Sequence, residues 1–77
     1  MTETEIESLI DHSPFQPYRF VLDDGEEVLV RRPRKASVSG GQLAAVGICR
    51  KAGANGGVEK LRLIRIDRIV SAEHVEG

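Results

Sequence analysis

Apolar side chains recur at helical spacing near the start of the chain. Those that fall on one face of a helix are Ile6, Leu9 and Ile10. Thr2 with Glu5, or Thr4 with Glu7, has the spacing of a capping box at a helix N-terminus. Pro14 disfavours a helical residue before it, so the pattern predicts a helix over about residues 4–12. A helix this short is not stable alone, and we expect its apolar face to pack against the rest of the chain.

The pattern then changes to the alternation that is typical of strands. It predicts a β-hairpin over residues 18–31, with its turn at Asp23-Asp24-Gly25. A two-residue turn at Asp24-Gly25 would place apolar and charged residues on the same face. A three-residue loop with a left-handed Gly25 keeps one face apolar, and we expect this register. Its pairs are Phe20 with Val28 and Tyr18 with Val30.

A second, longer hairpin is predicted over residues 43–66, joined by a glycine-rich loop at residues 52–57. Pro33 interrupts pairing after the first hairpin, and a short strand around residues 36–38 leads into the second. After a tight turn near residues 65–68, a last strand is expected at residues 69–73. The expected pairs of the second hairpin are Arg50 with Glu59, Ile48 with Leu61, Val46 with Leu63, Ala45 with Ile64 and Leu43 with Ile66.

Both faces of this second hairpin carry apolar residues, and a nine-residue helix can cover only one of them. We therefore expect one face to be exposed and to mark a contact between copies of the chain. The face with Ala44, Val46, Ile48, Leu61 and Leu63 is expected to be the inner one. The candidate self-association residues are those of the other face, Leu43, Ala45, Ile64 and Ile66.

Together these elements predict an α+β, mainly β fold in one domain spanning residues 1–77. A short N-terminal helix is followed by a strongly bent antiparallel sheet of four or five strands, or by a small barrel. The length of 77 residues leaves little material for an enclosed substrate cavity. The single cysteine and the lack of a long apolar run point to a cytoplasmic protein that does not enter a membrane.

Charge is distributed unevenly, although the net charge is only −1. Residues 1–30 carry eight acidic side chains and one basic one, whereas residues 31–77 carry ten basic and four acidic ones. One interpretation is a face that binds anions or nucleic acid. The other, which we favour, is that acidic segments neutralise the basic ones within the fold or between subunits. The candidate anion-binding residues are Arg31, Arg32, Arg34, Lys35, Arg62, Arg65 and Arg68.

Residues that could carry catalysis or hold a metal do not form a recognisable set. His12 and His74 lie far apart in the sequence, and Cys49 falls among apolar residues of a predicted strand. The acidic turn is typical of a solvated loop, and the glycine-rich loop lacks the Lys-Ser/Thr of a phosphate-binding loop. We therefore expect no enzymatic activity, no metal and no cofactor.

Two motifs resemble a family of short, uncharacterised bacterial proteins. They are Pro14-Phe15-Gln16-Pro17-Tyr18-Arg19 and Leu22-Asp23-Asp24-Gly25, and the likeness covers about residues 5–73. Members carry His-Pro-Glu where this chain has Arg32-Pro33-Arg34, and the family has no assigned activity. The chain also resembles Sm-like small barrels, through its initial helix, its Leu-Asp-Asp-Gly strand end and Ile64-Arg65-Ile66-Asp67. The RNA-binding motifs of those proteins have no counterpart here.

The functional expectation is a non-enzymatic β-domain that serves as a structural or protein-interaction module and associates with itself, as a dimer or a small ring, or with another protein. The alternative is a nucleic-acid-binding module that uses the arginine-rich face. Single-strand binders stack bases on aromatic side chains, and no aromatic residue follows Phe20. This favours the first function.

Overall fold

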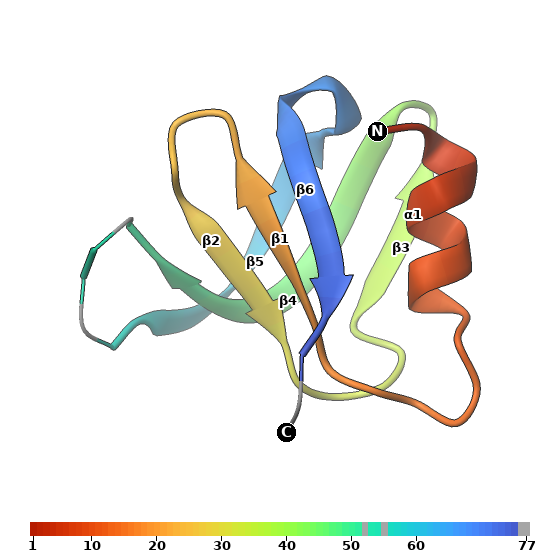
Figure 1. Ribbon diagram of the computed structural model, residues 1–77, viewed down its shortest axis with the longest axis horizontal. Coiled ribbons are helices and arrows are strands. Elements are labelled where there is room, and N and C mark those ends of the chain that lie inside the picture. The colour runs from red at the N-terminus through yellow and green to blue at the C-terminus, as the bar shows by residue number, and fades with distance from the viewer. Residues whose placement is uncertain (52, 55, 76–77) are drawn as a thin grey trace.

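The computed structural model describes residues 1–51, 53–54 and 56–75. One helix precedes six strands that form a single, strongly curled antiparallel sheet (Figure 1). The elements are α1 (Glu3–Ile10), β1 (Tyr18–Leu22), β2 (Glu27–Val30), β3 (Ala36–Ser39), β4 (Gln42–Arg50), β5 (Val58–Arg65), the 3-10 turn η1 (Ile66–Arg68) and β6 (Ile69–His74). This confirms the predicted mainly β fold, with six strands in place of four or five.

Helix α1 begins and ends close to the predicted positions. Thr2 is the N-cap and forms a complete capping box with Glu5, so the first of the two candidate pairs is the one used. Hydrogen bonds from the backbone and side chain of Thr2 hold the pKa of the Glu5 carboxyl below its usual value. The helix ends at Ile10, two residues earlier than predicted. Ile6 is fully buried, which docks the helix on the sheet.

Strand β4 organises the sheet because it pairs along both of its edges. Its first half pairs with β3, its second half pairs with β2, and β5 runs along its other edge. Strand β1 lies between β2 and β6. The resulting half-barrel has a loosely Sm-like topology, with β6 returning beside β1 (Figure 1).

The first hairpin has the predicted register, with Tyr18 opposite Val30 and Phe20 opposite Val28. Gly25 has a φ of 87°, the left-handed value that this register requires. The Asp24 side chain accepts a hydrogen bond of 2.9 Å from the Glu26 amide, which closes the turn.

The second hairpin differs from its predicted register by two residues. Val46 lies opposite Leu61, Leu43 opposite Ile64, and Ala45 opposite Arg62. Arg50 pairs with Glu27 of β2 at 3.0 Å instead of with Glu59. The pair nearest to the loop is Cys49 with Val58, so the loop is longer than six residues, and its Ala52 and Asn55 lie outside the described residues.

The core fills the concave side of the sheet. Its largest side chains are Tyr18 and Phe20, whose rings meet edge to face at 5.5 Å, and Phe15 packs at its margin. The remaining buried residues are Ile6, Leu22, Val28, Val30, Leu43, Ala45, Cys49, Ile64, Ile66 and Ile69. No helix among the described residues is long and apolar enough to cross a membrane.

Candidate interaction surface on the outer face

The four predicted self-association residues lie in the core instead of on the surface. Leu43, Ala45, Ile64 and Ile66 are each at most 7% exposed. The prediction assigned the two faces of the second hairpin the wrong way round. These side chains point into the concave side, where α1 and the other strands cover them, so they are not available for contact with a second copy.

The opposite face of the same strands carries an exposed apolar strip. The outer strip is defined here by its residues, Leu29, Ala44, Val46, Ile48, Leu61 and Leu63. Its members are neighbours in the sheet because Leu29 pairs with Ile48, Val46 with Leu61 and Ala44 with Leu63. Leu61 is 64% exposed and Leu63 is 70% exposed. The strip therefore crosses from β2 over β4 to Leu61 and Leu63 of β5, and Glu59, which lies opposite Ile48, bounds it on β5.

Strand β5 is also an edge of the sheet. Among the described residues it pairs only with β4, which leaves the backbone groups of its other side without a strand partner. It runs for eight residues, Val58–Arg65, whereas the edge strand β3 has four residues and lies against α1. The other edge strand, β6, has a register shift where it pairs with β1. β5 is thus the longest and most regular edge.

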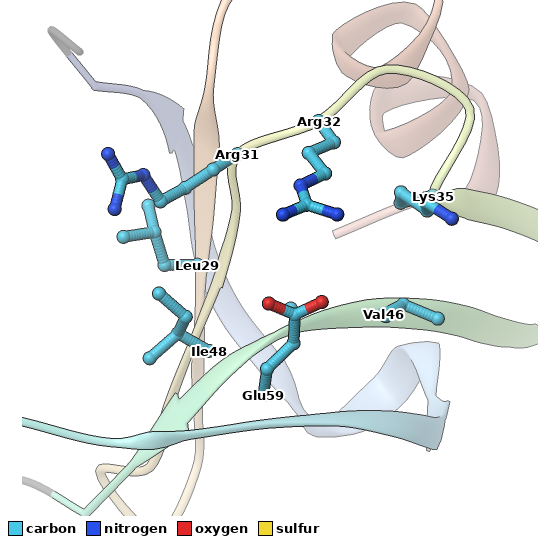
Figure 2. Close-up of a pocket in the computed structure, with 8 residues that line it drawn as sticks. Leu29, Arg31, Arg32, Lys35, Val46, Ile48 and Glu59 are labelled. Atoms are coloured by element: carbon cyan, nitrogen blue, oxygen red, sulfur yellow. The ribbon is translucent and has the colours of Figure 1, made fainter.

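A cleft of about 310 Å³ lies beside the outer strip (Figure 2). Its floor is formed by Leu29 of β2 and by Val46, Gly47 and Ile48 of β4. Basic side chains of the β2–β3 loop form one wall, and Glu59 of β5 forms the other; the basic ones are Arg31, Arg32 and Lys35. Arg32 and Glu59 point toward one another across the cleft in Figure 2, and no ion pair within 4.0 Å joins them.

The seven predicted anion-binding residues do not form one face. Arg62 points to the concave side, where it forms an ion pair with Glu26. Arg68 pairs with Asp23 at 3.2 Å and with Asp24 at 3.1 Å, and Arg65 pairs with Asp67 at 2.6 Å. Only Arg31, Arg32, Arg34 and Lys35, which we call the basic loop, lie together and exposed. No acidic side chain of the described residues lies within 4.0 Å of their charged groups.

The two histidines are neighbours in space, which the sequence did not reveal. The ring centroids of His12 and His74 are 4.6 Å apart, because the end of α1 lies beside the end of β6. Nδ1 of His12 lies 3.0 Å from the carbonyl oxygen of Pro14. Within the described ranges, no group of three or more His, Cys, Asp or Glu residues is placed to hold a metal ion.

Cys49 is buried on the concave side of β4, and burial raises the pKa of its thiol. Its Sγ lies 3.6 Å from the Gly47 carbonyl oxygen, to which the thiol donates. A protonated, buried thiol is a poor nucleophile, so Cys49 contributes packing to the core.

Comparison with protein-family models, with curated proteins and with solved structures gives no match to this chain. The interpretation of the surface therefore rests on the geometry described above.

Proposed function

We propose that this chain is a non-enzymatic module that associates with itself through β5 and the outer strip. One observation carries the proposal. Leu61 and Leu63 are both more than 60% exposed, and they lie on an eight-residue edge strand that pairs with β4 on one side and with no strand of the described residues on the other. A long, exposed, apolar edge favours pairing with another chain, which natural sheets usually prevent by covering, shortening or charging the edge.

The charged residues of β5 leave this part of the edge uncovered. They are Glu59, Lys60, Arg62 and Arg65. Arg62 and Arg65 form ion pairs with carboxylates of the same chain, and Leu61 and Leu63 stay exposed between the charged positions. A second copy placed along β5 would complete its backbone hydrogen bonds and cover the leucines of the outer strip. A contiguous apolar patch of this kind is typical of a contact surface.

Nucleic-acid binding is the less supported function. Three of the seven predicted basic residues, Arg62, Arg65 and Arg68, already form ion pairs with carboxylates of the same chain. The aromatic side chains that could stack on bases belong to the core or its margin. The basic loop is the part of the arginine-rich face that this alternative retains.

The test replaces Leu63 by lysine and measures the mass in solution. Leu63→Lys places a charge in the outer strip at a position that is 70% exposed, so the fold stays intact while association weakens by about tenfold or more. Val70→Lys is the matched control, since Val70 is an exposed valine of β6 outside the strip. Light scattering should give a monomer for Leu63→Lys and an oligomer for Val70→Lys. Equal masses for the two variants would rule out the outer strip as the contact.

A further inference from the structure

The charged residues of the chain fall into two classes. Every acidic side chain of the first hairpin has an arginine within ion-pair distance, and these acidic residues are Asp23, Asp24, Glu26 and Glu27. Their partners come from β1, β4, β5 and η1. The fold thus neutralises the acidic turn internally, as one interpretation of the sequence expected.

The second class consists of charged side chains without an ion-pair partner among the described residues, and it includes the two acidic residues at the end of α1. Glu7 and Asp11 are exposed and form no ion pair with a described residue. Both lie in or beside the last turn of the helix, which contains no basic residue. Negative charge there is unfavourable, because the C-terminal end of a helix carries the negative end of its dipole. The helix therefore presents uncompensated negative charge to its surroundings.

The basic loop presents the opposite charge. All four of its cationic side chains are exposed, and Arg34 has a φ of 64°, a left-handed value that non-glycine residues rarely adopt. Three of the side chains stand over the apolar floor of the cleft, which continues into the outer strip.

We propose that the acidic end of α1 in one copy binds the basic loop of a second copy. Glu7 and Asp11 would face Arg31 and Arg32 at the cleft. This inference rests on the proposed self-association, and it names the second contact of that assembly. The outer strip supplies most of the affinity, whereas the charged contact speeds encounter and fixes the orientation of the two copies.

A second copy fits the cleft better than a nucleic acid does. Glu59 stands in the opposite wall and disfavours any anion bound by Arg32, and the repeating negative charge of a nucleic-acid backbone needs several cations at once. A carboxylate from the end of a helix needs only one or two of the cations, and the same contact would remove the unfavourable charge at the end of α1. The end of α1 is negatively charged and the basic loop is positively charged, so the two patches are complementary.

The experiment exchanges the charges of the two patches. The loop variant is R31E/R32E, the helix variant is E7K/D11K, and K51E is the control for a charge change elsewhere on the surface. At low salt, each of the first two should associate about tenfold or more weakly than the wild type. An equimolar mixture of the two should recover association, because each variant then meets its complement. K51E should behave as the wild type does.

A neutral helix variant, E7Q/D11N, keeps the test interpretable if the lysine variant does not fold. Removing negative charge from the end of α1 should raise the stability of the folded chain and still weaken association. If stability and association both rose, or both fell, the result would contradict the proposal, because it would indicate that Glu7 and Asp11 have a purely structural role.

The outcomes separate this inference from the function on which it rests. Wild-type chain that stays monomeric would overturn both. Wild-type oligomers that Leu63→Lys disrupts, but that the charge variants leave unchanged, would overturn only the contact between α1 and the basic loop. So would a mixture that fails to recover association. Loss of binding to a labelled single-stranded RNA by the loop variant, with its assembly intact, would assign the basic loop to nucleic acid instead.

Discussion

Tyr18 shows how strongly a single side chain depends on this small core. It is 1% exposed, it lies between the rings of Phe15 and Phe20, and it is the only tyrosine of the chain. Burial, with a further contribution from the negative charge of Asp11, raises the pKa of its hydroxyl to about 12 from an ordinary value of 10.0. The neutral form of Tyr18 is therefore part of the folded state.

This pKa predicts a loss of stability in alkali. Between pH 10 and pH 12 the unfolded chain releases the Tyr18 proton while the folded chain retains it, so stability falls as the pH rises. The total effect is about 3 kcal/mol, from two pH units at 1.36 kcal/mol each. Ultraviolet absorbance of the phenolate gives the pKa directly. Tyr18→Phe should lose this component of the alkaline decrease, and a titration midpoint near pH 10 in the folded chain would contradict the account.

Gly25 sets the first hairpin through its backbone conformation. Because its φ is 87°, Gly25→Val should lower the free energy of unfolding by roughly 1–3 kcal/mol. Gly25→Asn should lower it less, since asparagine tolerates the left-handed region better than valine. Chemical denaturation measures both values. Equal stability of the valine variant and the wild type would show that the turn does not depend on this conformation.

At the scale of the element, the curvature of β4 depends on small residues along its concave side. Leu43, Ala45, Gly47 and Cys49 alternate there, and a Cβ atom on Gly47 would lie 2.4 Å from the carbonyl oxygen of Leu29. The absence of a side chain at position 47 is what lets β2 approach β4 at the bend. The same small residues leave room for the core inside a tightly curled strand.

Gly47→Ala is therefore expected to destabilise the fold by roughly 1–3 kcal/mol, the usual cost of overpacking a site that cannot yield. Ser37→Ala, on the exposed side of β3, should change the stability by less than about 0.5 kcal/mol. Thermal and denaturant unfolding of the two variants provide the comparison. A Gly47→Ala variant as stable as the control would mean that β2 and β4 are further apart than described.

The elements show which parts of the fold the sequence determines. The first hairpin was predicted with its correct register because, of the two short turns considered at Gly25, only the three-residue one keeps one face apolar. The second hairpin was predicted two residues out of register because its long loop does not constrain the ends of β4 and β5. A shift by two keeps each side chain on its face, so the division into two apolar faces was correct.

Which face is concave could not be read from alternation alone, because it depends on how the whole sheet curls around α1. One signal was present in β4, where Ala45, Gly47 and Cys49 are small enough for the crowded inside of a bend. The ion-pair partners of the basic residues were still harder to predict from the sequence. Arg62 and Arg68 meet carboxylates that lie more than 30 residues away, and only the folded topology brings them together.

At the scale of the whole molecule, the sheet closes only part of a barrel. The concave side is filled by one core, and the ion pairs of Arg62 and Arg68 tie the first turn to β5 and η1. The convex side keeps the outer strip, the basic loop and the free edge of β5. Substitutions there should alter association without altering the fold. Ile64→Arg, in contrast, would place a charge in the core and is expected to unfold the chain.

The central claim is that the chain associates with itself. Sedimentation equilibrium of the wild-type protein, purified after nuclease treatment, tests it most directly over a concentration series up to about 100 µM. We predict that the average mass rises with concentration to a multiple of the 8.4 kDa of the single chain. A mass that stays at 8.4 kDa across the whole series would contradict the account.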